Sequence, residues 1–214
     1  MKTAFFVIAF TMLVCQALPA QNKNSIFVEE TPITWLGIDF TGAMFFGDED
    51  KFATDEDIHK FMESINDLML AEPAKYDIAK TFKKNNVTDA FQITAAQNRR
   101  FQARALIGKP EDANHQLSAT IIQEIVDSYD FQGKSGVGLM FNVESFSKPT
   151  VRGVVWITFV DMATKEVILT ERLSNPPGGF GLRNYWAGSI YGILKQIQKK
   201  EFMAWQKKHY RVQQ

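Results

Sequence analysis

Two acidic side chains within strongly apolar segments are the first candidates for chemistry. Asp39 stands near the end of the apolar run 33–40, and Glu144 stands inside the alternating segment that begins at Val137. Two carboxylates that lie close together can act as general acid and general base, which leaves a small hydrolase as an alternative function. The competing interpretation is that Asp39 caps a turn and Glu144 is solvated or hydrogen-bonded on a strand. The sequence does not choose between these two interpretations.

A glycine-rich loop is the second candidate site. Gly178, Gly179 and Gly181 precede Arg183, where a long helix is expected to begin. Free backbone N–H groups at a helix N-terminus bind anions, and an arginine strengthens that binding. The loop nevertheless lacks the Lys-Ser/Thr of a P-loop and follows an antiparallel segment, so it matches neither nucleotide-binding motif. A tight turn that lets the helix pack closely on the sheet is the favoured interpretation, with small-anion binding as the alternative.

The sequence contains no motif that is typical of a metal site or a cofactor site. The three histidines, His59, His115 and His209, have no second ligand at the spacing of a metal site. No serine lies in a nucleophile elbow, and the acidic run 48–57 departs from the calcium-loop pattern. We therefore expect neither a metal nor a cofactor.

The C-terminal segment combines aromatic side chains with lysines and is the candidate partner contact. Phe202, Trp205 and Tyr210 extend the apolar stripe of the last helix beyond the width of a small sheet. They are expected to overhang the domain, where they would contact an anionic membrane surface or another envelope protein. The alternative is that they fold back onto the N-terminal segment and are purely structural.

The N-terminus has the layout of a secretory signal peptide. Lys2 precedes an apolar run of 11 residues, 4–14, which is too short to span a bilayer, and small residues follow up to Ala20. Cleavage is expected after Ala20. Cys15 is the single cysteine, and the bulky Val14 before it disfavours lipidation, so the mature chain is expected to lack cysteine. The predicted location is the periplasm or the extracellular space.

Charge and hydropathy limit the classes of partner. The chain holds 24 basic and 24 acidic residues, and removal of Lys2 with the signal peptide leaves 23 against 24, a net charge of −1. A nucleic-acid-binding protein would be strongly basic, so no nucleic-acid partner is expected. No transmembrane segment is expected after signal cleavage.

Apolar periodicity predicts the elements that would position these residues. Helical spacing covers the region that follows Thr54, with Asp57 as the return partner of a capping box, and a second amphipathic helix is predicted at 117–129. Residues 87–95 are a strand candidate. Residues 137–173 are predicted to form a three-stranded antiparallel meander, with an alternating first strand from Val137 and a central strand at 151–160 that is apolar on both faces. We predict an α+β (mixed α/β) fold with a single sheet of about five strands and helices mainly on one face. The predicted organisation is a signal peptide (1–20), a flexible leader (21–31) and one globular domain (32–214) that ends in a long helix.

Three short motifs carry a resemblance to known proteins. They are Gly-x-Gly-x-x-Phe-x-Val-Glu-Ser at 136–145, Trp-x-Thr-Phe-x-Asp at 156–161 and Gly-Gly-Phe-Gly-x-Arg-Asn-Tyr-Trp-Ala at 178–187. With the Trp-Leu-Gly-Ile-Asp segment at 35–39, they resemble a family of uncharacterised exported proteins that is widespread in Bacteroidetes. The resemblance implies a cell-envelope or secreted location and implies no activity. The expected function is a non-enzymatic binding or assembly module of the cell envelope.

Overall fold

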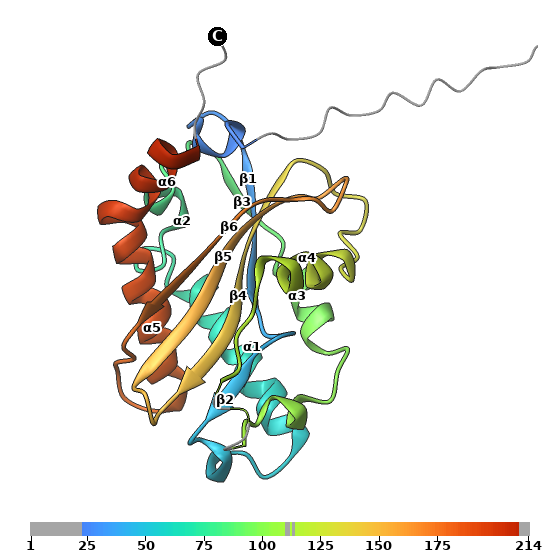
Figure 1. Ribbon diagram of the computed structural model, residues 1–214, viewed down its shortest axis with the longest axis vertical. Coiled ribbons are helices and arrows are strands. Elements are labelled where there is room, and N and C mark those ends of the chain that lie inside the picture. Colours follow the sequence, from blue (N-terminus) through green and yellow to red (C-terminus); the bar gives the residue numbers. More distant parts are fainter. Residues whose placement is uncertain (1–22, 110–111, 113, 210–214) are drawn as a thin grey trace, which may run out of the picture.

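The computed structural model describes residues 23–109, 112 and 114–209, and its centre is one mixed β-sheet (Figure 1). The strands are β1 (Ile33–Asp39), β2 (Met44–Phe46), β3 (Val87–Asp89), β4 (Val137–Ser147), β5 (Arg152–Asp161) and β6 (Val167–Asn175). Their order is β3-β1-β4-β5-β6, and β2 pairs with β4 beyond the end of β1. The structure therefore has the predicted α+β fold with a single sheet of five to six strands.

Strand direction follows from the lengths of the connections. Short turns join β4, β5 and β6, and these strands form the predicted antiparallel meander. The pairs of β1 with β3 and β4, and of β2 with β4, are parallel, and the segments between the paired strands contain helices. Parallel pairing requires such long crossovers.

The helices divide between the two faces of the sheet. They are α1 (Asp55–Ala71), α2 (Ile78–Thr81), α3 (Phe91–Asn98), α4 (Ala119–Asp127), α5 (Leu182–Gln196) and α6 (Phe202–His209), with a π-helical segment η5 (Ile197–Glu201) between the last two. Short 3-10 turns are η1 (Ser25–Phe27), η2 (Glu49–Lys51) and η3 (Ala103–Leu106). Figure 1 shows α5 and α6 along one side of the sheet, with α3 and α4 on the other. The capping box predicted at Thr54 and Asp57 begins α1.

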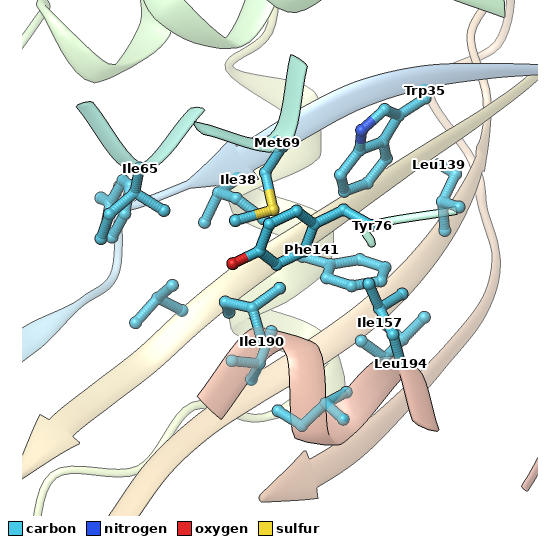
Figure 2. Close-up of a cluster of buried hydrophobic side chains, with 14 of the residues drawn as sticks. Trp35, Ile38, Ile65, Met69, Tyr76, Leu139, Phe141, Ile157, Ile190 and Leu194 are labelled. Carbon is cyan, nitrogen blue, oxygen red and sulfur yellow. The ribbon is translucent and has the colours of Figure 1, made fainter. Parts of the chain in front are cut away.

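The long helices cover what we call the apolar face of the sheet. Side chains of α1, β4, β5 and α5 meet there in one cluster, which Figure 2 shows around Ile65, Met69, Leu139, Phe141, Ile157, Ile190 and Leu194. Aromatic rings add edge-to-face contacts, such as Trp35 with Phe141 at 4.8 Å between centroids. The core of the domain lies mainly on this face.

The opposite face, which we call the polar face, has a smaller core under α3 and α4. Ile93 of α3 and Ile122 of α4 pack there against Leu36 and Met140 of the sheet. Buried polar side chains, Asp39 and Asn142 among them, lie beside these apolar ones. This face contains the residues of the candidate site.

The predicted strand at 87–95 is half strand and half helix. Pairing with β1 ends at Asp89, and α3 begins at Phe91. Phe91 belongs to the core of the apolar face and Ile93 to that of the polar face. Residues i and i+2 of a helix point about 200° apart, so α3 can send the side chains of Phe91 and Ile93 to different cores. In a strand, residues i and i+2 would both point to the same face.

Residues 21–31 were expected to form a flexible leader, but the described part of this segment, which begins at residue 23, packs on the domain. Ile26 and Phe27 are buried, and the ring of Phe27 lies 5.5 Å from that of Phe202 in α6. Packing thus begins before the expected domain boundary at residue 32. Residues 1–20, the predicted signal peptide, lie outside the described residues.

The expectation that Phe202 and Trp205 overhang the domain is wrong. Both are buried, and Phe202 contacts Phe82 as well as Phe27. The π-helical segment η5 explains how they reach the core: it widens one turn, so that Phe202, five residues after Ile197, stays on the buried side. The alternative interpretation, packing onto the N-terminal segment, is the one that the structure supports. Tyr210 lies outside the described residues.

Within the part of the chain that the structure describes, no helix combines the length and the apolar composition that a bilayer crossing requires.

Candidate functional site

Asp39 is the first of the two candidate carboxylates, and it is buried at the end of β1. Its Oδ1 accepts hydrogen bonds from the Thr41 hydroxyl at 2.6 Å, the Thr41 N–H at 3.3 Å and the Tyr129 hydroxyl at 2.8 Å. Its Oδ2 accepts from Nδ2 of Asn142 at 2.9 Å. Burial and the neighbouring Asp39 carboxylate raise the pKa of Tyr129 well above its usual value, so Tyr129 remains a donor. Four donors hold this carboxylate in a structural network.

A row of cross-strand neighbours links Asp39 to the far edge of the sheet. Asp39 is paired with Asn142 of β4, Asn142 with Trp156 of β5, and Trp156 with Arg172 of β6. Directly opposed residues of neighbouring strands project to the same face. The row therefore carries polar groups across the polar face from a buried carboxylate to a half-exposed guanidinium.

Glu144, the second candidate carboxylate, lies at a β-bulge of β4. Val143 and Phe146, three positions apart, both enter the core of the apolar face, because the bulge between Val143 and Ser145 inserts one residue. The Glu144 side chain lies on the polar face, where its Oε2 accepts hydrogen bonds from Nε1 of Trp156 at 2.9 Å and the N–H of Leu117 at 3.2 Å. Strand alternation places the Glu144 side chain on the same face as that of Asn142, two positions earlier, and the bulge then brings Phe146 back to the apolar face.

Arg172 neutralises Glu144. Its Nε donates to Oε2 at 3.0 Å and its Nη2 to Oε1 at 2.6 Å, which is a two-point contact. Burial alone raises the pKa of Glu144, but the hydrogen bonds from Arg172 and Trp156 outweigh it, and the pKa of Glu144 lies below its ordinary value. The same contact raises the pKa of Arg172. At neutral pH the pair is an ionised carboxylate and a guanidinium.

A cleft of about 430 Å³ lies beside this ion pair, at the end of β4 that follows Val143. Its lining residues are Phe46, Gly47, Glu49, Gly108, Lys109, His115, Gln116, Glu144, Ser145, Ser147, Pro149, Thr150, Val154 and Arg172.

The lining of the cleft combines fixed charges with apolar surface. Lys109 and Arg172 are its cations, and Glu49 and Glu144 are its anions. Phe46, Pro149 and Val154 supply the apolar part. Clefts of this size and mixture are typical of small-molecule sites, in which a few polar groups fix the orientation of a ligand.

The two carboxylates lie on one sheet face but do not share this cleft. Glu144 lines it, whereas Asp39 does not. Each is tied to its own donors, Asp39 to Tyr129 and Asn142, and Glu144 to Trp156 and Arg172. The arrangement matches the structural interpretation of both residues: Asp39 caps the turn at Thr41, and Glu144 is hydrogen-bonded on a strand.

The glycine-rich loop has the geometry of a tight turn. Gly179 and Gly181 have positive φ angles of 121° and 79°, and Gly181 is the N-cap of α5. The N–H of Gly178 donates to the Tyr185 carbonyl at 2.9 Å, and a Cβ on Gly188 would lie 2.1 Å from the Gly178 oxygen. The loop thus packs directly on the first turns of α5, and the exposed Arg183 donates to its neighbour Asn184.

Two asparagines that the sequence did not single out complete the edge of β1. Asn66 of α1 accepts from the Ile38 N–H at 2.7 Å and donates to the Ile38 carbonyl at 3.0 Å. Asn98 of α3 donates to the same carbonyl and accepts from the Phe40 N–H. Pairing with β3 stops at Trp35, so these amides replace the missing strand. For Asn66 the available signal was an asparagine inside the apolar pattern of the helix that follows Thr54. Asn98 had no such signal, because no helix was predicted there.

Among the described residues, no group of three or more metal-ligating side chains is close enough to hold a metal ion. Nε2 of His115 forms a hydrogen bond with the Gly42 carbonyl oxygen at 2.9 Å. Nε2 of His209 lies 2.9 Å from Oε1 of Glu171.

Comparison with known proteins adds little to this geometry. No family model matches the chain, and no curated protein matches it. Among solved structures, the LpoB C-terminal domain from Salmonella enterica, in its selenomethionine form, matches with a TM-score of 0.30 and 11% identity. The match covers 69% of this chain and 84% of that one. At this TM-score the likeness carries no argument about function.

Proposed function

We propose that this protein is an exported binding module of the cell envelope, and that the cleft on its polar face is the binding site. Export rests on the signal-peptide layout of residues 1–20, with Lys2 before an apolar run and Ala20 at the cleavage position. Binding without catalysis rests on the way the candidate carboxylates are held.

One observation carries the proposal: the Glu144–Arg172 pair is fixed in the wall of the cleft. Trp156 and the Leu117 N–H hold the carboxylate, and the carboxylate holds the guanidinium at two points. Polar groups whose orientation is fixed before the ligand arrives bind it with less loss of conformational entropy. A preorganised pair beside an apolar wall is an arrangement suited to recognition.

The hydrolase alternative has weaker support. A general acid must hold a proton near neutral pH, and the pKa of Glu144 is lowered instead. Asp39, the second carboxylate that such a mechanism would use, does not line the cleft. Binding of a small anion by the glycine-rich loop is also less favoured, because the Gly178 N–H is already bonded to Tyr185.

Amide chemical-shift mapping tests the binding proposal. The mature protein is titrated separately with N-acetylphenylalanine, N-acetylphenylalaninamide and maltose at millimolar concentration. At least one probe should shift the amides of Ser145, Val154 and Arg172. Thr150→Trp places a large side chain at the exposed rim of the cleft and should abolish these shifts. Ile121→Trp, on the exposed side of α4, is the matched control and should leave them unchanged.

Two outcomes would contradict the proposal. Shifts that are spread outside the cleft, or that persist in Thr150→Trp, would mean that the cleft is not the site. Release of N-acetylphenylalanine from the amide, with loss of that release in Glu144→Gln, would favour the hydrolase.

Export has its own test. N-terminal sequencing of protein secreted by a bacterial host should begin at Gln21, or at Leu18 if cleavage follows Ala17. Protein that retains Met1 in the cytoplasm would contradict export, and an acylated Cys15 would show a lipoprotein.

A further inference from the structure

We infer that the ligand of the cleft carries a single carboxylate, which Arg172 binds through the end of its guanidinium group. This inference rests on the proposed function and names the chemical class of the ligand. Four observations support it: the bonding pattern of Arg172, the exposure of the Arg172 side chain, the charge balance of the cleft and the apolar lining of the cleft.

The bonding pattern of Arg172 leaves one edge of the guanidinium open. A guanidinium has five N–H donors, and carboxylates bind it bidentately along an edge. Glu144 occupies the edge formed by Nε and Nη2. Within the described part of the chain, Nη1 of Arg172 has no hydrogen-bond partner, and 42% of the side chain is exposed. The edge formed by Nη1 and the second hydrogen of Nη2 is therefore free for a second carboxylate.

Glu144 makes this open edge a defined site. The Glu144 side chain is only 2% exposed and is anchored by Trp156 and Leu117, so the guanidinium that it holds cannot rotate freely. An exposed arginine normally samples many rotamers and loses that freedom on binding. Here the internal ion pair restricts those rotamers before a ligand arrives.

The charges of the cleft favour a carboxylate over a phosphate. Among the described residues that line the cleft, Lys109 and Arg172 are two cations and Glu49 and Glu144 are two anions, so these charges balance. A bound carboxylate then adds one net negative charge, and it meets the open edge of Arg172 directly. A phosphate dianion would add two charges beside the same two acids, and like charges at this range repel.

The apolar wall indicates what the carboxylate is attached to. Phe46, Pro149 and Val154 supply the apolar lining of the cleft, and they come from β2, the β4–β5 turn and β5 respectively. A volume of about 430 Å³ accommodates a small organic acid with an apolar body. The inferred ligand class is therefore a small amphipathic monocarboxylate.

Calorimetric titration with three matched probes tests the inference. N-acetylphenylalanine carries the carboxylate, N-acetylphenylalaninamide is its neutral analogue, and phenyl phosphate carries a dianion. The acid should bind at least about tenfold more tightly than the amide, which is the effect of one charge-assisted contact of about 1.4 kcal/mol. Phenyl phosphate should bind more weakly than the acid.

Two variants of the ion pair make the test specific. Arg172→Lys keeps a cation beside Glu144 but removes the guanidinium edge that binds a carboxylate at two points. The affinity for the acid should therefore fall to near the affinity for the amide. Glu144→Gln leaves only one side-chain oxygen to accept from Arg172, so the guanidinium regains rotamer freedom and binding of the acid should become several-fold weaker. Thermal unfolding of both variants, compared with the unmodified protein, verifies that each is folded under the conditions of the titration.

The outcomes separate this inference from the proposed function. Equal binding of acid and amide, lost in Thr150→Trp, would overturn the carboxylate inference and leave the cleft as a binding site. Tighter binding of phenyl phosphate, or an unchanged acid affinity in folded Arg172→Lys, would also overturn it. Absence of binding by all three probes and by maltose would count against both.

Discussion

The two faces of the sheet differ in what their side chains do. On the apolar face, α1, α5 and α6 bury a continuous cluster of aliphatic and aromatic side chains. On the polar face, α3 and α4 cover a smaller core that shares its space with the networks of Asp39 and Glu144. The apolar face can stabilise a domain for which no disulfide is expected, because burial of apolar area contributes to the free energy of folding without requiring a specific orientation of each side chain.

This difference limits where a ligand can bind in this fold. Aromatic residues of the apolar face, such as Phe202 and Trp205, are committed to the core. On the polar face, the oriented pair of Glu144 and Arg172 lies in the wall of an open cleft. The four predictions that follow test this division of roles, beginning with the largest expected effect.

Removal of an aromatic ring from the apolar face should have the largest effect. Phe202→Ala should lower the free energy of unfolding by about 3–5 kcal/mol, because it leaves a cavity beside Phe27 and Phe82. Urea denaturation measures the loss. Met203→Ala, at a neighbouring position that is 56% exposed, is the control and should change stability by less than about 0.5 kcal/mol. Similar values for the two variants would mean that Phe202 is not part of the core.

The docking of α5 on the apolar face depends on the backbone of Gly181. Its φ of 79° and ψ of 153° fall in a region essentially restricted to glycine, so Gly181→Ala should destabilise the protein by about 1–3 kcal/mol. Gly178→Ala is the matched control within the same loop, since its φ is not positive and no atom lies within 4 Å of a Cβ there. Equal stability of the two variants in urea would remove the backbone explanation of this loop.

Lys84 is a charge buried at the margin of the apolar face. Burial lowers its pKa to about 8, although Glu29 and Glu30 act in the opposite direction. Between this value and the ordinary value of 10.5 the unfolded chain binds more protons, so stability should rise with pH in that window. The expected gain is about 2 kcal/mol from about pH 7 to about pH 9.5.

Urea denaturation across this pH range measures the effect, and Lys84→Met is the control that should flatten it. A profile that keeps its slope in Lys84→Met would assign the dependence to another group.

The polar face should respond to loss of a single hydrogen bond. Tyr129→Phe takes one of four donors from the buried Asp39 carboxylate, and we expect a loss of about 1–2 kcal/mol. Tyr191→Phe, at a half-buried position of α5, should be close to neutral. If Tyr129→Phe were also neutral, the Asp39 network would not contribute to the stability of this face.

Much of the fold could be predicted from local patterns in the sequence. The predicted three-stranded segment 137–173 corresponds to β4, β5 and β6, and the short turns between these strands require antiparallel pairing. Thr54 and Asp57 begin α1 as a capping box, since that contact spans only three residues. Such features depend on neighbours in the chain, and local physical chemistry is sufficient to predict them.

Predictions that depended on where an element lies in space fared less well. The C-terminal helix was expected to outrun the sheet, but the N-terminal segment packs Phe27 against Phe202 and extends the core. Residues 87–95 alternate like a strand, but only three of them find a partner in β1. In both cases a segment distant in sequence decided the outcome.

Local patterns were sufficient to predict the fold class, the meander, the capping box at Thr54, and Asp39 and Glu144 as unusual acids in apolar surroundings. What those acids do became clear only from the folded chain, because their partners Tyr129 and Arg172 lie 90 and 28 positions away. The same holds for the cleft, whose lining residues come from β2, β4, β5, β6 and the loops between distant elements. Periodicity is a property of a segment, whereas a binding site is formed by side chains that meet only after the chain has folded.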